Sequence, residues 1–583
     1  MAQQDNSLTI EAPRQGIAAS AHLGYADVRN LDIHSSPGVT RLNKILGKRS
    51  ATTVTSAPKW LEPNPKNNAE EFALDGNGVP YYGTVNATSW AVLNGYSSTS
   101  THGNGLKIWK DYLFVARDAH LDTFGPLTGV TFTASEANPM VITTSANHYL
   151  SIYDRVILYS TGHITSSGAV VFTNNGTAYY VASTPTGTTF TLSATSGGTE
   201  LNSLGGTQSG THTFKAWQKN SLTYWKQLQS DTSFQTMYIS SNDGKLYGGS
   251  GRYVFSVDEA SGQTFNPGNS ATYSFNDQAL DLPIDYRIKS ISEIGSYLAL
   301  GTWQGVLIND NPVADIFLWD RSSASFGQPI RIKDYGCHAL LNDNGSLVCL
   351  VGLQGKILRC DGVNYTEIGR LPIELEPANG AYCEFYPGGI AKFKDRVFFS
   401  CGGSAALKGI GVYSIKQTGQ GTVLVLEHLN SELNDGSTVG IKITCLAQIS
   451  PTGLSIGFAS DAATYGIDTT SSTYAYSTSY SGYYDTMLSK IGNPKSKGVL
   501  SSLELEFAKK LATGEGVRIL YRYNLTDTFA ELGTYTMDVA GTTKIGAESS
   551  FFAPISLKDS KVQFRIALLG ATTTPELKEV RFS

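Results

Sequence analysis

Short apolar stretches recur along the middle of the chain, and each follows a polar turn. Six of them align on one apolar position, occupied by Leu113, Leu246, Leu298, Leu347, Val397 and Leu454. From Leu246 onward, consecutive aligned positions are about fifty residues apart, a spacing found in propeller repeats. Most of these stretches precede a second one in which apolar and polar residues alternate, as in "GRYVFSVDE" (251–259) and "GIGVYSIKQ" (409–417). A buried strand followed by a half-exposed strand in every repeat is typical of propeller blades.

This pattern predicts an all-β protein built on a β-propeller of six or seven blades. Six blades are visible, and residues 74–96 supply a seventh. We expect the propeller to occupy residues 61–126 and 215–490. A β-solenoid is the alternative, but its repeat of about 20 to 30 residues fits the spacing less well.

One segment interrupts the repeat, because the interval between Leu113 and Leu246 is much longer than the others. Removing residues 127–214 restores a length close to one blade, so we expect a small β-domain to be inserted there. Its stretch Gly176–Gly198 has no charged residue and is rich in Ser and Thr. This favours a surface that meets another protein or a glycan, with Tyr179 and Tyr180 as candidate contact residues. An insertion without any partner is the alternative.

The two ends of the chain differ from the middle. Residues 472–486 contain Tyr474, Tyr476, Tyr480, Tyr483 and Tyr484. Such a run is either a strip that stacks on sugars or bases, or an edge strand or extended interface segment. Alternating stretches over 499–583 predict a C-terminal β-sandwich. Residues 1–60 have too little apolar mass for a core, so we expect an extended assembly segment that packs on the propeller or on a neighbouring subunit.

Composition narrows the function classes. The formal net charge is -5, so no basic field favours nucleic acid or an anionic membrane. No nucleotide loop, nucleophile elbow or zinc motif is present, and the nine histidines do not pair at metal-ligand spacing. We therefore expect no cofactor, no metal and no catalytic residues, and the protein is predicted not to be an enzyme. His338 follows Cys337, and this pair is interpreted as part of a blade core.

The carboxylates and cysteines do not single out a function. A glycosidase needs two facing carboxylates, and nothing selects one pair among the 49 Asp and Glu residues. The six cysteines are expected to be reduced core residues, although disulfides stay open. The first residues lack the features of a signal peptide, and no apolar run is long enough for a membrane span.

Two segments resemble phage virion proteins. The insertion is similar to a small β-module of phage tail and structural proteins, through "YDRVILYSTG" (153–162), "GTAYYV" (176–181), "TFTLSATSGG" (189–198) and "GTHTF" (210–214). In that module a glycine stands where this chain has Tyr153, so the first turn is expected to differ. The segment "ADVRNLDIHSSPGVTRL" (26–42) resembles the start of phage tail proteins. The matching positions are Arg29, Asn30, Asp32, Pro37 and Gly38.

The resemblance implies a structural protein of a phage tail, at the tail tip or nozzle. The protein would be made in the host cytoplasm, and copies of it would form a ring that lines or closes the DNA exit channel. The five N-terminal positions would serve assembly, and the partners would be other copies, neighbouring tail proteins or fibres, and transiently the genomic DNA. The first alternative is a receptor- or glycan-binding tail protein. The second is a propeller hydrolase acting on polysaccharide.

Overall fold

The computed structural model describes an all-β chain with one short helical turn, η1 (Ser270–Thr272), in its described part. The described residues are 8–11, 27–33, 39–44, 46–50, 54–67, 69–84, 90–93, 102–117, 120–162, 177–202, 209–218, 236–304, 313–371, 383–403, 409–418, 421–429, 433, 442–460, 463–471, 476–479, 482–490, 498–500, 503–537, 555–557 and 561–582.

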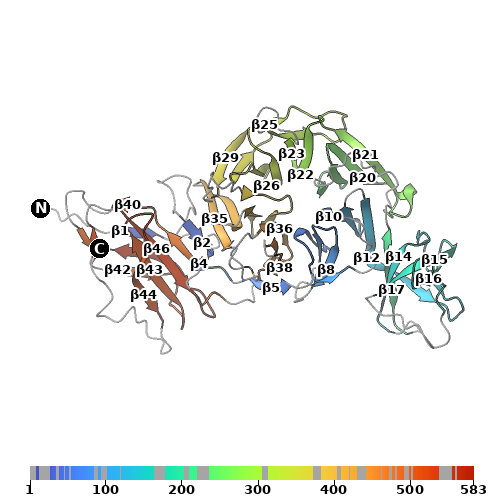
Figure 1. Ribbon diagram of the computed structural model, residues 1–583, viewed down its shortest axis with the longest axis horizontal. Coiled ribbons are helices and arrows are strands. Elements are labelled where there is room, and N and C mark those ends of the chain that lie inside the picture. The colour runs from blue at the N-terminus through green and yellow to red at the C-terminus, as the bar shows by residue number, and fades with distance from the viewer. Residues whose placement is uncertain are drawn as a thin grey trace.

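Five four-stranded antiparallel sheets stand in a propeller-like ring (Figure 1). The first is β6 (Pro58–Pro63), β7 (Glu70–Asp75), β8 (Pro80–Thr84) and β9 (Ala91–Val92). The next three are β18 (Thr236–Ile239), β19 (Leu246–Ser250), β20 (Tyr253–Glu259) and β21 (Tyr273–Asp281); β22 (Tyr286–Ile294), β23 (Tyr297–Gln304), β24 (Ala314–Trp319) and β25 (Ile330–Ile332); and β26 (Cys337–Asp343), β27 (Ser346–Val351), β28 (Lys356–Cys360) and β29 (Tyr365–Arg370). The fifth is β36 (Lys442–Gln448), β37 (Leu454–Ala459), β38 (Tyr465–Thr469) and, from the N-terminal part, β5 (Gly47–Ser50).

Two strand sets of larger sheets complete the ring. They are β10 (Gly103–Trp109), β11 (Tyr112–Arg117) and β12 (His120–Ala134), and β31 (Ile390–Phe393), β32 (Arg396–Ser400), β34 (Gly411–Thr418) and β35 (Gly421–Leu429). The first strands of all these sets contact one another in cyclic order: β6, β10, β18, β22, β26, β31, β36 and again β6. The ring therefore closes through strands that are nearly 400 residues apart in the chain.

Both faces of a ring sheet are buried, because each sheet packs against a neighbour on either side. In β23, Leu298 and Leu300 belong to the core shared with Tyr247 of the preceding sheet, whereas Ala299 belongs to the core shared with Leu347 of the following sheet. Successive side chains of a strand point to opposite faces. This is why the strand sequences at the aligned positions are continuously apolar rather than alternating.

The inserted segment forms a separate six-stranded barrel beside the ring (Figure 1). Its strands pair in the closed order β12, β13 (Val141–Thr144), β16 (Thr189–Ser193), β15 (Ala178–Thr186), β14 (Arg155–Ser160) and β17 (His212–Gln218), and β17 returns to β12. Its core contains Ile142, Val181, Phe190 and Phe214, all buried. Closure leaves no free sheet edge, so this small domain needs little charge on its strands.

The barrel turn before β14 keeps a glycine-like conformation despite its tyrosine. Tyr153 has φ 75° and Tyr149 has φ 52°, in the left-handed region that favours glycine. Tyr153 is 59% exposed, and Ile152 and Tyr149 beside it are also exposed. The turn thus presents an apolar surface on a strained backbone.

The C-terminal part consists of two sheets on the other side of the ring from the barrel (Figure 1). One sheet is β1 (Leu8–Glu11), β47 (Leu577–Phe582) and β42 (Leu503–Phe507). The other continues from β35 through β2 (Asp27–Arg29), β39 (Gly482–Asp485), β46 (Lys561–Leu569), β43 (Gly516–Arg522) and β44 (Ala530–Thr536), with β40 (Ser489–Lys490) on β46. Residues of both sheets, such as Val580 and Ile566, share one core. Three small pairs are β3 (Leu31–Asp32) with β4 (Arg41–Leu42), β30 (Cys383–Glu384) with β33 (Gly402–Gly403), and β41 (Gly498–Leu500) with β45 (Ile555–Leu557).

Strand β2 joins the ring to the C-terminal sheets. It lies parallel to β35 at Arg29 and Leu426, and antiparallel to β39. Buried charges reinforce this junction, because Arg396 of β32 contacts Glu427 at 2.6 Å and Asp32 at 3.3 Å. The Asn43 amide donates a 2.7 Å hydrogen bond to the other oxygen of Glu427. The N-terminal segment is therefore held by its own chain.

Strand pairing shifts the expected domain boundaries. Residues 1–60 contribute β5 and the start of β6 to the ring, so the ring begins at residue 47 rather than 61. Strands β12 and β17 cross the limits expected for the insertion at 127 and 214. Strand β39, expected in the propeller, pairs with β46 of the C-terminal part. Strands β5 and β39 are therefore recruited to the edges of sheets whose other strands are remote in sequence.

Replacing Arg396 by Met tests the junction. Glu427 would keep a buried charge without its cationic partner, so we expect the free energy of unfolding to fall by about 3 to 5 kcal/mol. Urea-induced unfolding of the full chain, followed by circular dichroism, measures this loss.

The matched control is Arg370→Met, because Arg370 and Glu367 form an exposed pair on β29. We expect it to cost at most about 1 kcal/mol. Adding Glu427→Leu to Arg396→Met should recover part of the stability, since it removes the uncompensated charge. Equal losses for the two arginine variants would contradict the role of the buried pair.

Candidate functional site

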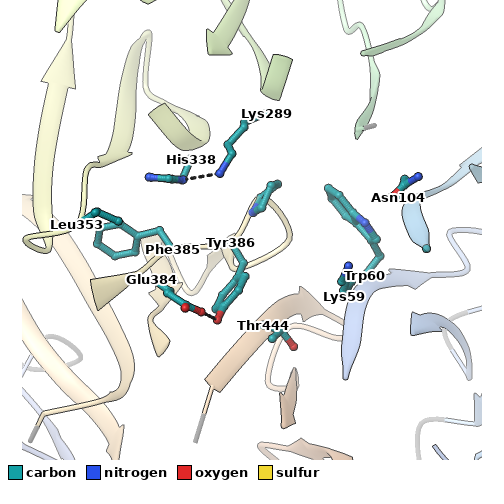
Figure 2. Close-up of a pocket in the computed structure, with 12 residues that line it drawn as sticks. Lys59, Trp60, Asn104, Lys289, His338, Leu353, Glu384, Phe385, Tyr386 and Thr444 are labelled. Atoms are coloured by element: carbon teal, nitrogen blue, oxygen red, sulfur yellow. Dashed lines mark hydrogen bonds between the residues drawn. The ribbon is translucent and has the colours of Figure 1, made fainter. Parts of the chain in front are cut away.

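A cavity of about 320 Å³ lies where the first strands of the ring converge. Its lining residues come from β6, β10, β22, β26 and β36, from the turn between β27 and β28, and from the segment 383–387 that leads into β31. They are Lys59, Trp60, Gly103, Asn104, Lys289, His338, Leu353, Glu384, Phe385, Tyr386, Pro387 and Thr444. Figure 2 shows these side chains arriving from different sides of the ring. The volume is that of a pocket for a small molecule.

Each of the five polar residues that the first strands contribute to the lining lies at a β-bulge. Each lies where the strand register shifts, so that it has no partner opposite it in the second strand. The residues are Lys59, Asn104, Lys289, His338 and Thr444. A bulged residue breaks the alternation of the strand and re-aims its side chain, which is why bulges are frequent beside functional sites. Five separate strands thus direct one polar residue each to the same cavity.

Lys289 and His338 form a pair at one end of the cavity. The Lys289 ammonium donates a 3.0 Å hydrogen bond to Nδ1 of His338, drawn as a dashed line in Figure 2. Burial and then the nearby lysine charge hold the pKa of His338 well below its usual value. The imidazole is therefore neutral at pH 7, and its proton lies on Nε2, because Nδ1 accepts from lysine. That Nε2 is buried, and no atom in the described part of the chain accepts its proton.

Asn104 on β10 is a second buried residue with unpartnered polar atoms. Asn104 is 3% exposed, and neither its Oδ1 nor its Nδ2 has a hydrogen-bond partner among the described residues. Leaving a buried polar group unsatisfied costs about 1 to 3 kcal/mol, so each such group in a folded protein calls for a partner. Asn104 lines the cavity, but both polar atoms of its side chain are buried.

Aromatic and acidic residues form the remaining walls. The Tyr386 hydroxyl donates a hydrogen bond to Glu384, which also lies 3.5 Å from the ammonium of Lys442. Burial and the charge of Glu384 raise the pKa of Tyr386 well above its usual value, so the phenol keeps its proton. Trp60 reaches between Asn104 and Tyr386 in Figure 2. Trp60 and Tyr386 keep partial exposure, so the cavity is in contact with solvent.

The charged side chains of the lining are mainly cationic. Lys59 and Lys289 outnumber the single carboxylate, Glu384, among the lining residues. Burial lowers the pKa of Lys59, and the charge of Asp75 acts in the opposite direction. Hydrolysis of a glycoside normally needs two facing carboxyl groups, and the described lining offers one.

The sequence-predicted assembly residues lie within the chain's own junction. Arg29 is in β2, where its guanidinium lies 5.6 Å from the ring centre of Tyr483. Asn30 is buried, and its backbone N–H donates to the carbonyl of Leu426. Asp32 pairs with Arg396. Pro37 and Gly38 lie outside the described residues.

The tyrosines proposed as surface contacts divide into three groups. Tyr179 and Tyr484 are 3% and 0% exposed, because they face the barrel core and the C-terminal core. These two are not available to a partner, which corrects that expectation. Tyr180, Tyr476 and Tyr483 are half-buried, each beside a cation: Arg155, Lys44, and Arg565 with Arg29. Tyr474 and Tyr480 lie outside the described residues.

Most of the cavity residues were not predicted, although a signal exists. Asn104, Lys289 and His338 each stand nine residues before an aligned leucine, namely Leu113, Leu298 and Leu347. A polar residue at the same repeat position in three blades is unexpected for a buried strand. The aligned apolar positions lie in the following strand, and the adjacent Cys337–His338 pair favoured a core role for His338. The structure places His338 in a buried wall of the cavity.

The described residues contain no group of three His, Cys, Asp or Glu side chains placed to hold a metal ion. All six cysteines are buried and unpaired. No helix in the described part of the chain is long and apolar enough to cross a bilayer.

Comparison with known proteins adds little. No family model matches the chain, and no curated protein matches it. Among solved structures, the chain is similar to the Dos1 propeller (TM-score 0.38, 9% identity, 73% of this chain and 94% of that chain). It is also similar to the computationally designed Ika8 protein (TM-score 0.33, 11% identity, 72% of this chain and 99% of that chain). A third similar structure is YCF48 bound to a D1 peptide (TM-score 0.33, 9% identity, 76% of this chain and 99% of that chain). These weak likenesses do not identify a phage protein, and the description of the ring rests on its own strand pairing.

The buried His338 predicts a pH dependence of stability. Its pKa in the folded chain is lower than in the unfolded chain, so the unfolded chain binds the proton first as the pH falls. Below about pH 6.5, the free energy of unfolding should decrease by up to about 1.4 kcal/mol per pH unit from this group. His338→Gln should remove that part of the slope. Urea titrations of both proteins at pH 7.5, 6.5 and 5.5 measure it, and identical slopes would contradict the assignment.

Proposed function

We propose that the protein is a structural component of a phage tail, placed at the tail tip or nozzle. The observation that best supports this is the way its three parts are joined. The barrel and the C-terminal sheets are connected to the ring by shared strands instead of linkers. Strand β12 pairs with β11 in the ring and with β13 and β17 in the barrel. Strand β2 pairs with β35 and β39 at the other junction.

Such joints suit a scaffold that holds two attachment bodies at fixed positions. Hydrogen-bonded strands resist bending far better than a Gly- or Ser-rich linker does. We count the seven strand sets as seven blades and the C-terminal sheets as a sandwich, which makes the ring a rigid centre. Copies of the chain would close a larger ring through heterologous contacts. Genomic DNA would pass through that larger ring, since the cavity of about 320 Å³ cannot hold a duplex.

The barrel turn at Tyr149, Ile152 and Tyr153 is the contact that we assign to a neighbouring tail protein or fibre. Exposed apolar side chains on a strained backbone are often kept for function. The N-terminal residues Arg29, Asn30 and Asp32 would instead serve the internal junction on which both bodies depend. This proposal combines the geometry with the resemblance of the inserted segment to phage modules.

Gold-labelled antibodies against the full chain test the location. We expect label in a cluster at the distal end of the tail when tailed particles from the source culture are viewed by electron microscopy. Pre-immune serum on the same particles is the control. Label along fibres would replace the proposal by the receptor-binding alternative, and particles without label would overturn it.

Tyr153→Gly tests the barrel turn separately. Glycine accepts a φ of 75° without strain, so we expect the melting temperature of the purified chain to be unchanged or higher. Incorporation into particles should fall several-fold, measured as gold label per tail. Val363→Ser is the matched control, because Val363 is 76% exposed on a turn of the ring. Equal incorporation of both variants would exclude the turn as a contact.

A further inference from the structure

A second cavity, of about 160 Å³, lies between the first ring sheet and the barrel. Residues of β7, β8 and β9, with Leu93 after them, line its ring side, and residues of β12, β14 and β17 line its barrel side. In Figure 1 these strands lie where the barrel joins the ring. Ligand pockets are frequent at such boundaries between two bodies. A cavity of about 150 Å³ already holds a molecule as large as benzene, so this one accommodates a compact ligand.

The ring wall of this cavity combines a carboxylate with aromatic side chains. Phe72 of β7 and Tyr82 of β8 are cross-strand partners, and their ring centres are 5.9 Å apart. Glu70 lies two residues before Phe72, so it points to the same face of β7. One oxygen of Glu70 accepts a 2.9 Å hydrogen bond from the Asn64 amide. The Tyr82 hydroxyl is in contact with solvent and has no hydrogen-bond partner among the described residues.

The barrel wall of the cavity carries a cation. Ile157 of β14 and Lys215 of β17 are cross-strand partners, and Tyr159 lies two residues further along β14. These side chains point away from the barrel core, which receives Val156 and Leu158 instead. The Lys215 ammonium lies 5.1 Å from the ring centre of Tyr159. This ammonium is in contact with solvent, and it forms no hydrogen bond or ion pair within the described part of the chain.

The two walls therefore present opposite charges, on Glu70 and Lys215, that do not pair with each other. Burial lowers the pKa of Lys215, and the charges of Glu70 and Asp111 act in the opposite direction. Burial raises the pKa of Tyr82 and of Tyr159, so both phenols keep their protons and can donate them. A ligand with one cationic and one anionic group would satisfy both walls through charge-assisted hydrogen bonds, which are the stronger ones.

The floor between the walls is apolar. Phe72, Leu93, Phe124 and Ile157 line it, and each is at most 6% exposed. An apolar side chain gains free energy when it moves from water onto such a surface. Val92 at the rim is 44% exposed, so the cavity is open to solvent on the side of β9.

We propose that this cavity binds a free α-amino acid with an apolar side chain. Its ammonium contacts Glu70, its carboxylate contacts Lys215, and its side chain lies against Phe72 and Phe124. The ligand is a free amino acid because both charges are needed together, whereas a peptide terminus carries only one of them. The site does not depend on the proposed structural role in the tail.

Isothermal titration calorimetry with the full chain tests the ligand class. The probes are L-leucine, L-valine and L-phenylalanine, then the N-acetyl and amide forms of the tightest binder, and L-aspartate. We expect saturable binding of at least one apolar amino acid. Its blocked forms and aspartate should bind at least about tenfold more weakly, because each lacks the ammonium, the carboxylate or the apolar side chain. Absence of saturable binding by all three apolar amino acids would overturn the proposal, and so would equal binding of either blocked form.

Substitutions on the two walls test the assigned contacts. Lys215→Met should weaken binding about ten- to a hundredfold, and this variant should no longer prefer the amino acid to its amide. Glu70→Gln should in the same way lose the preference over the N-acetyl form. Lys245→Met is the control, because Lys245 pairs with Asp258 on another ring sheet. The melting temperature of each variant separates loss of binding from loss of fold. Wild-type affinity in Lys215→Met or in Glu70→Gln would overturn the corresponding contact.

Discussion

Closure of the ring is the constraint on which the rest of the structure depends. Strand β5 pairs with β38, which joins Lys48 to Asp468 across the whole propeller. The first strands then form a closed cycle in which β36 contacts β6, and the Thr444 hydroxyl donates to the carbonyl of Pro58. Once the cycle is closed, every sheet has a neighbour on each face. Because both faces of each sheet are then buried, successive residues of its inner strands are apolar.

The appended bodies are attached to the ring through shared strands. A ring sheet has an outer edge with unpaired backbone groups, and such an edge recruits further strands. At one outer edge β12 continues into the barrel, with β17 pairing along both halves of it. At another outer edge, β2 pairs with β35 and with β39, and β39 pairs in turn with β46. The buried cluster of Arg396, Glu427 and Asp32 makes the second junction specific as well as stable.

The side chains at the centre of the ring differ in polarity from those packed between its sheets. Apolar side chains fill the spaces between sheets, but the converging first strands leave an opening that small shifts in register can line with polar groups. The bulges at Lys59, Lys289 and His338 achieve this without disturbing the apolar residues on either side of them. A ring can therefore hold a polar cavity at its axis while its stability resides elsewhere.

The local pattern of the sequence was sufficient for the repeat, the all-β class and the inserted β-domain, because these depend on neighbours in the chain. The apolar runs at Leu298 and Leu347 and the interruption after residue 126 are readable without a structure. The tertiary structure alone decided which remote segments pair, because a sheet edge accepts any strand of suitable length. It placed β5 in the last sheet, β2 between two bodies, and Tyr484 in a core instead of at the surface. The tertiary structure also determined which residues line the central cavity. A bulge breaks the two-residue period on which strand prediction relies, and only the closed ring brings Lys59, Asn104 and His338 together.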